Sequence, residues 1–158
     1  MARKNIKEKA QKLVLYYSLV CGIAFVDHLF KLYAEKNPGA FKEVVKNKGF
    51  TGEKMSDRPD LVRNTSLIIT GLNLAALPFF PERTPEEKLR KAGWILMSGG
   101  GLSNTADRII RREVIDYIRK GKYVYNLGDF AIAGGCAAYL SGVLLEALRN
   151  PPDPVSTR

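Results

Sequence analysis

The chain has one histidine and two cysteines among its 158 residues, so it holds few of the side chains that bind transition metals. Cys21 and Cys136 each lie inside an apolar stretch, where an isolated cysteine is expected to be a small buried hydrophobic residue rather than half of a disulfide. His28 has no cysteine or second histidine near it in the sequence, whereas a zinc site needs a cluster of such ligands. We therefore expect no metal site and no cofactor.

Charge is also missing from four long stretches, although charged residues make up 26% of the chain. Each stretch is 14 to 16 residues long, and they cover 13–26, 66–81, 92–106 and 130–145. A soluble bundle would carry charges every three or four residues along each helix, because one face of each helix meets water. A membrane span needs roughly 20 mainly apolar residues, and a few flanking residues extend each stretch to that length. The pattern favours four spans.

The predicted fold is therefore an all-α membrane protein with one domain, residues 1–148. We expect its four transmembrane helices at about 12–34, 61–81, 89–108 and 128–147. The tail, 149–158, contains three prolines and is expected to be disordered.

The segment between the first two spans is expected to lie outside the cytoplasm and to contain a small β element. Asn37-Pro38-Gly39 ends the first helix, and residues 41–45 have strand character. Thr84-Pro85-Glu86-Glu87 is typical of a helix start, with a cap, a proline and two acids. Gly99-Gly100-Gly101 lacks the Lys-Ser/Thr that would follow in a phosphate-binding loop, so we interpret it as a site of close helix packing.

The net charge of +9 has more than one interpretation. A nucleic-acid surface is disfavoured because no aromatic-basic motif accompanies the charge, whereas anionic lipid headgroups or solvated loops would both suit it. A basic N-terminus precedes the first apolar stretch, and no small-x-small cleavage site follows that stretch. The two features predict a retained first span with its N-terminus in the cytoplasm. Lysine and arginine divide almost evenly between the two sides, so their count does not set the orientation. The mean hydropathy of -0.14 keeps a soluble basic helical bundle open as an alternative.

Ionisable residues at the ends of the apolar stretches are the candidate functional groups, because such groups are costly at membrane depth. They are Asp27, Lys31, Asp107, Asp116 and Asp129. If the last two helices form an antiparallel hairpin, all of these groups lie near one membrane surface. Two close carboxylates share one proton, so one can take a proton from water while the other polarises a peptide carbonyl. Helix capping, or pairing with nearby arginine and lysine, is the alternative role.

Three motifs in the second half of the chain contain these aspartates. They are Asn104-Thr105-Ala106-Asp107-Arg108, Val114-Ile115-Asp116-Tyr117 and Tyr125-Asn126-Leu127-Gly128-Asp129. Their order and spacing are similar to Asn-x-x-Asp-Arg, Val-x-Asp-Phe and Phe-Asn-x-Ala-Asp of the lipoprotein signal peptidases (signal peptidase II). Two upstream motifs, Asp27-His28-Leu29-Phe30-Lys31 and Asn47-Lys48-Gly49, also resemble that family. The resemblance covers about residues 13–147.

The resemblance implies a membrane aspartyl endopeptidase that cuts a prolipoprotein signal peptide just before a diacylglyceryl-modified cysteine. It implies that Asp116 and Asp129 form the catalytic pair, near the extracytoplasmic surface of the cytoplasmic membrane. Supporting or substrate-binding roles are implied for Asn47, Asn104, Asp107, Arg108 and Asn126, and a structural polar pair for Asp27 and Lys31. The expected partners are lipid-modified prolipoproteins and membrane lipid, with no nucleic acid, and the expected state is a monomer.

The chain departs from the family pattern at several positions. Arg112 stands where the family usually has glycine, five residues after the aspartate of Asp-Arg, and Gly128 replaces an alanine. The loop between the last two motifs is short and carries Arg119, Lys120 and Lys122. None of these changes removes a catalytic group. They do leave open a non-catalytic protein of the same fold that binds lipoprotein segments.

Overall fold

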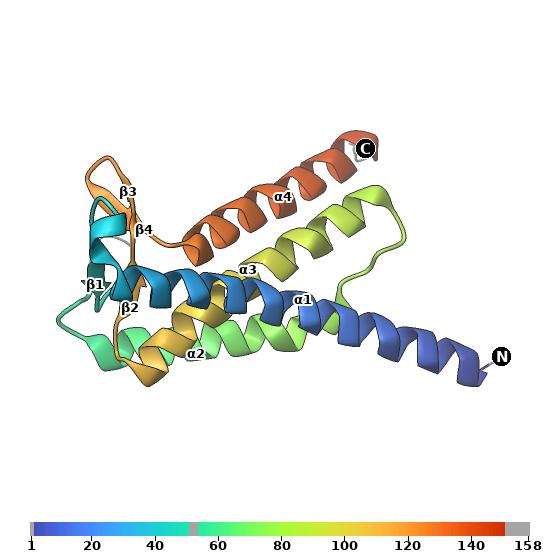
Figure 1. The fold of residues 1–158 in the computed structure, drawn as a ribbon. Helices are drawn as coiled ribbons and strands as arrows, with labels where there is room; N and C mark the ends of the chain where they lie inside the picture. The colour runs from blue at the N-terminus through green and yellow to red at the C-terminus, as the bar shows by residue number, and fades with distance from the viewer. Residues whose placement is uncertain (1, 51–53, 151–158) are drawn as a thin grey trace.

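The computed structural model describes residues 2–50 and 54–150, with side chains from Ile6 onward. Four helices form an elongated bundle, with both described chain ends near one end and the short strands at the other (Figure 1). The helices are α1 (Ala2–Lys36), α2 (Pro59–Ala76), α3 (Pro85–Ile110) and α4 (Leu127–Arg149). Two 3-10 turns, η1 (Pro38–Ala40) and η3 (Leu77–Phe79), follow α1 and α2.

Helix α3 is the centre of the bundle, and its three consecutive glycines face three different helices. A side chain at Gly99 would lie 2.6 Å from Ile23 of α1, and one at Gly101 would lie 3.4 Å from Thr70 of α2. A side chain at Gly100 would collide with the carbonyl group of Gly128 in α4. The close-packing interpretation of this motif is confirmed.

Helices α3 and α4 also meet backbone to backbone further from the strands. A side chain at Gly93 would lie 2.5 Å from the carbonyl oxygen of Gly135, and one at Gly135 would lie 2.6 Å from that of Gly93. Small residues at a helix interface permit such an approach, which is common between helices in membranes.

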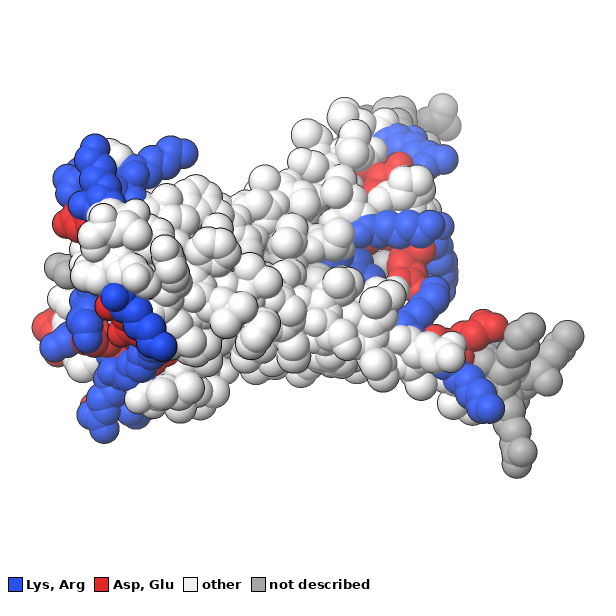
Figure 2. All heavy atoms as spheres, in the orientation of Figure 1, with Lys and Arg blue, Asp and Glu red and all other residues white. Residues whose placement is uncertain are grey.

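The outer surface of the bundle is apolar. Large exposed hydrophobic side chains occur along α1, α2 and α4, among them Phe25, Leu72, Leu140 and Leu144. On the face drawn in Figure 2, lysines, arginines and carboxylates gather at the two ends, and an uncharged band separates them. Two helical segments, Ile6–Lys36 and Leu127–Arg149, are long and apolar enough to cross a membrane, with only 11% of each apolar window buried.

The expectation that both cysteines are buried is wrong. Cys21 and Cys136 are free and exposed. The apolar stretches that contain them turn much of their surface outward, because the bundle core is small and centred on Val20, Leu77 and Ile95. An apolar neighbourhood in this sequence therefore does not indicate burial inside the protein.

Two small antiparallel strand pairs cover the end of the bundle opposite the N-terminus. Strand β1 (Val45–Asn47) pairs with β2 (Val114–Asp116), which sets Val45 opposite Asp116 and Asn47 opposite Val114. Strands β3 (Ile118–Lys120) and β4 (Tyr123–Tyr125) form a hairpin that turns at Gly121, where φ is +64°.

Several predicted element boundaries differ from the structure, among them the second span, expected over 61–81, where helix α2 ends at Ala76 and the η3 turn follows. The strand expected over 41–45 begins only at Val45, because Phe41 closes the η1 turn and packs its ring 5.3 Å from that of Tyr117. Helix α4 includes Arg149, which was expected in the disordered tail, and residues 151–158 of that expected tail lie outside the described part of the chain. The predicted helix start at Thr84 is confirmed by a capping box with Glu87.

Candidate active site

Asp116 ends strand β2 and is 3% exposed. Its Oδ1 accepts a hydrogen bond from Asn126 Nδ2 at 2.6 Å, and its Oδ2 accepts one from Asn47 Nδ2 at 3.1 Å. Asn47 is itself oriented, because its Oδ1 accepts from the Gly49 N–H at 2.9 Å. Burial, and then the charge of Asp129, raise the pKa of Asp116 to about 6.

Asp129 is the third residue of α4 and part of that helix's capping box. Its N–H donates to Asn126 Oδ1 at 2.9 Å, and its Oδ2 accepts from the Asn126 N–H at 3.2 Å. Its Oδ1 accepts from Asn104 Nδ2 at 2.9 Å. The capping role considered from the sequence is therefore present at Asp129, and it fixes the carboxylate rather than excluding a second role.

Asn126 is fully buried and links the two aspartates, because it forms hydrogen bonds with both. Asp116 and Asp129 also line one cavity of ≈ 170 Å³ together with Asn47, Asn104 and Arg108. The strand end and the helix start thus bring together two carboxylates that stand thirteen positions apart in the chain.

Arg108 lies on the side of the cavity formed by the segment between α1 and α2. Its Nη2 donates to the Gly49 carbonyl oxygen at 2.9 Å, and its Nη1 donates to that of Asn104 at 3.2 Å. Its Nε–H is buried and has no hydrogen-bond partner among the described residues. The guanidinium also lies 5.5 Å from the centre of the Phe50 ring.

Lys31 is fully buried behind the aspartate pair and organises a second group of polar residues. Its Nζ lies 2.8 Å from Asp27 Oδ2 and 3.0 Å from Asp107 Oδ2. The same ammonium donates to Asn104 Oδ1 at 2.8 Å. Asn104 therefore accepts from Lys31 and donates to Asp129, which sets the orientation of its amide. Asp107 lies in this group and does not line the cavity.

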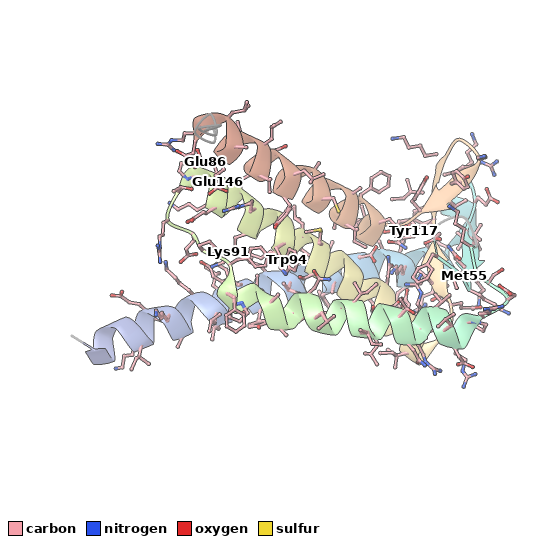
Figure 3. The ribbon with its side chains drawn as sticks, turned by 180° about the vertical axis from the view of Figure 1, so that it is seen from behind. Met55, Glu86, Lys91, Trp94, Tyr117 and Glu146 are labelled. Atoms are coloured by element: carbon pink, nitrogen blue, oxygen red, sulfur yellow. The ribbon has the colours of Figure 1, made fainter. Side chains whose placement is uncertain are left out.

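Two polar residues that sequence reasoning did not select complete this group. Ser103 Oγ donates to Asp27 Oδ2 at 2.6 Å and accepts from Lys31 at 3.1 Å. The Tyr117 hydroxyl donates to Asp27 Oδ1 at 3.3 Å and accepts from the Leu127 N–H. Figure 3 shows Tyr117 at the strand end of the molecule. Tyr117 directly follows Asp116 in its motif, so the motif could have indicated Tyr117 as a site residue. Nothing in the sequence distinguished Ser103.

A hydroxyl strip on the α2 side of the cavity was also missed. Thr70 and Thr105 share a hydrogen bond of 2.8 Å, and the Thr105 hydroxyl reaches the carbonyl oxygen of Ser66 at 3.3 Å. Ser66, Thr70 and Thr105 all line the cavity. A helical spacing of four residues between Ser66 and Thr70 was the available signal, because it sets both on one face.

The arrangement suits acid–base chemistry at a peptide bond. Asp116 is buried and Asp129 is partly buried, and each of their four carboxylate oxygens already accepts one hydrogen bond. The raised pKa of Asp116 favours a proton shared by the pair near neutral pH. In residues 2–50 and 54–150, no group of three or more histidine, cysteine, aspartate or glutamate residues is placed to hold a metal ion.

The backbone conformation at Arg112 shows why the family pattern usually has glycine at this position. It is one of two non-glycine residues with positive φ in the described part of the chain, at 63°. Glycine adopts this left-handed conformation without the clash that a Cβ introduces. The glycine usual at this position therefore matches the backbone that the loop between α3 and β2 requires.

Comparison with known proteins identifies a family and two curated relatives. A family model described as signal peptidase (SPase) II matches residues 4–145. The lipoprotein signal peptidase of Geobacillus kaustophilus (strain HTA426) is 38% identical over 74 residues, which cover 43% of this chain and 48% of that protein. The one from Xylella fastidiosa (strain M12) is 34% identical over 95 residues, covering 56% and 54%. The chain thus spans about half the length of the curated relatives it matches.

Two solved bacterial membrane enzymes share the fold. One aligns with a TM-score of 0.65 at 19% identity, over 88% of this chain and 92% of the other. The second aligns with a TM-score of 0.60 at 17% identity, over 82% and 92%. Since the family model extends over most of the chain, from residue 4 to residue 145, this protein belongs to the signal peptidase II family.

Proposed function

We propose that this protein is a membrane endopeptidase that cleaves the signal peptide of prolipoproteins just before a diacylglyceryl-modified cysteine. Asp116 and Asp129 activate the attacking water. The observation that carries this proposal is the meeting of both carboxylates at one cavity, joined by hydrogen bonds to the same residue, Asn126. Family membership supports the substrate class.

The reaction needs one proton on the pair. The ionised carboxylate takes a proton from water as the water oxygen attacks the scissile carbonyl carbon, while the protonated carboxyl donates to the carbonyl oxygen. Collapse of the tetrahedral intermediate breaks the C–N bond: the carboxyl that took the proton from water gives it to the leaving amine of the cysteine, and a hydroxyl of the intermediate returns its proton to the other carboxylate as the carbonyl re-forms. The free Arg108 Nε–H is suited to hold a substrate carbonyl oxygen beside the pair.

We also propose that all four helices cross the membrane, with the aspartate pair near the extracytoplasmic surface. Helix α2 has 18 residues and α3 has 26, lengths of about 27 and 39 Å at 1.5 Å per residue. Leu67, Ile68 and Leu72 expose an apolar face of α2, and the uncharged band in Figure 2 supports a hydrocarbon-facing surface. The site lies at one end of that band, where a lipid-bearing substrate can enter from the bilayer.

The test uses the protein purified in detergent and two peptides that differ only in the diacylglyceryl group on cysteine. We expect cleavage of the lipidated peptide on the amino side of the cysteine and little cleavage of the plain one. Asp116→Asn and Asp129→Asn should each abolish the reaction. Asp57→Asn is the matched control, because Asp57 is 75% exposed and does not line the cavity.

The same assay addresses the alternative of a non-catalytic protein that binds lipoprotein segments. Binding of the lipidated peptide with no product from the unaltered protein would favour that alternative and reject the peptidase. Full activity in either aspartate variant would reject the assignment of the pair.

A further inference from the structure

A second cavity lies at the end of the bundle opposite the aspartate pair. Its volume is ≈ 390 Å³, and residues from α1, η3 and the start of α3 line it. Figure 3 shows Lys91 on the side of the molecule away from Tyr117. The proposed catalytic residues do not contribute to it.

An ionic cluster around Glu82 lines this cavity, with Lys91 buried, Glu82 partly exposed and Lys12 exposed. Lys91 is only 7% exposed, and its Nζ lies 3.2 Å from Glu82 Oε2 and 4.4 Å from the centre of the Tyr16 ring. Lys12 and the Tyr16 hydroxyl also donate to this carboxylate. The hydrogen bond from Lys12, followed by those from Tyr16 and Lys91, lowers the pKa of Glu82 to about 2. The Glu82 carboxylate therefore already accepts hydrogen bonds from three side chains of the protein.

The rim of the cavity carries positive charge that this carboxylate does not balance. Lys9, Lys12, Arg83 and Lys91 line the cavity against the single carboxylate of Glu82, an excess of three positive charges. Lys9 and Arg83 are exposed, and neither forms an ion pair with another described residue. An anion entering the cavity would meet these two free cations first.

The remaining lining is apolar and continues onto the outer surface. Leu13, Phe79 and Phe80 line the cavity, and Phe79 is 84% exposed. The cavity thus combines a cationic rim with an apolar wall. A free inorganic anion would use only the rim, whereas an amphiphile with a phosphate headgroup would use both.

We propose that this cavity binds the headgroup phosphate of an anionic phospholipid, with Lys9 and Arg83 contacting the phosphate and Leu13 and Phe79 contacting the acyl chains. Each basic side chain near a membrane surface contributes favourably to the binding of anionic lipid. The site is separate from the proposed peptidase pair, so it stands or falls independently of that function.

The experiment is native mass spectrometry of the detergent-purified protein with phosphatidylglycerol or phosphatidylcholine of identical acyl chains. We expect tighter one-to-one binding of phosphatidylglycerol. The double variant Lys9→Gln/Arg83→Gln should bind phosphatidylglycerol about tenfold more weakly, because it removes two cations from the rim. The matched control Lys42→Gln/Lys122→Gln removes the same charge from exposed positions at the other end and should keep the preference.

Three outcomes would overturn the proposal. They are equal binding of the two lipids, an unchanged lipid preference in the Lys9→Gln/Arg83→Gln variant, and displacement of phosphatidylglycerol by an equal concentration of glycerol 3-phosphate. The last result would assign the cavity to a free phosphate compound rather than to a lipid. Cleavage of the lipidated peptide, measured in parallel, should be unchanged in both double variants.

Discussion

At the scale of residues, the candidate site depends on three asparagines that orient two carboxylates. Asn47, Asn104 and Asn126 each present an amide N–H to an aspartate while the amide oxygen accepts a hydrogen bond elsewhere. Because the oxygen of each amide is occupied, the amide cannot turn over without losing a hydrogen bond. The aspartates are consequently held in place before any substrate binds.

The negative charge of Asp129 should have a measurable effect on the pKa of Asp116. Folding raises the pKa of Asp116 from 3.8 to about 6, so the folded state gains stability from its protonation below about pH 4 and loses it as the pH rises through 6. We expect Asp129→Asn to lower the pKa of Asp116 toward 3.8, since it removes a neighbouring negative charge. Carboxyl ¹³C NMR in detergent would measure it. An unchanged or higher pKa, with Asp57→Asn as the control, would contradict the coupling.

Arg112 should be a site where glycine stabilises the protein. Its φ of 63° strains any residue with a Cβ, so we expect Arg112→Gly to raise the free energy of unfolding by about 1 kcal/mol. Thermal unfolding in detergent would show this as a higher midpoint. Arg112→Ala is the control, because it removes the same side chain and retains the strain. Equal midpoints for the two variants would show that the backbone conformation is not the cause.

At the scale of elements, the four helices and the capping box at Thr84 could be predicted from charge-free stretches and local cap residues. Strand β1 was misplaced because three-residue strands carry almost no periodic signal, and here pairing with β2 determines where the strand begins. The exposure of Cys21 and Cys136 was also missed. An apolar residue on the exposed face of an apolar helix has the same sequence environment as one in a core.

The motifs indicated which polar residues to consider but not how they connect. The link from Lys31 through Asn104 to Asp129 joins three helices, and no spacing along the chain encodes it. Ser103 was missed for the same reason. Contacts of this kind depend on how α1, α3 and α4 pack, which is decided by the glycines between them.

The contact of α3 with α4 should be sensitive to a single methyl group at Gly100. A Cβ there would collide with the Gly128 carbonyl group, one residue from Asp129. We expect Gly100→Ala to lower the free energy of unfolding by about 1–3 kcal/mol and to reduce cleavage by displacing Asp129. Gly134→Ala is the control, because no atom lies within 4 Å of the added methyl. Thermal unfolding and peptide cleavage would check both effects, and wild-type behaviour of Gly100→Ala would contradict this packing.

At the scale of the whole molecule, the charged ends and the uncharged band explain why composition alone favours a soluble protein over a membrane protein. A mean hydropathy of -0.14 suits a soluble protein, because the charged ends offset the apolar middle in the average. The distribution of charge in space, with large exposed hydrophobic side chains between the ends, is typical of a membrane protein.

This distribution predicts how the protein leaves a membrane. We expect high salt to leave it in the membrane fraction and detergent to release it, because an apolar surface rather than surface charge holds it there. Fractionation followed by immunoblotting would measure this. Release by salt alone would instead support a soluble basic bundle.

The proposed aspartate pair is tested most directly by comparing cleavage rates of Asp116→Asn, Asp129→Asn and the double variant on the lipidated peptide. If the carboxylates act as one unit, each single change should lower the rate by about 10³-fold or more, and the double change should be no worse than either single change. Additive losses, or near-normal rates in one single variant, would contradict a catalytic pair formed by Asp116 and Asp129.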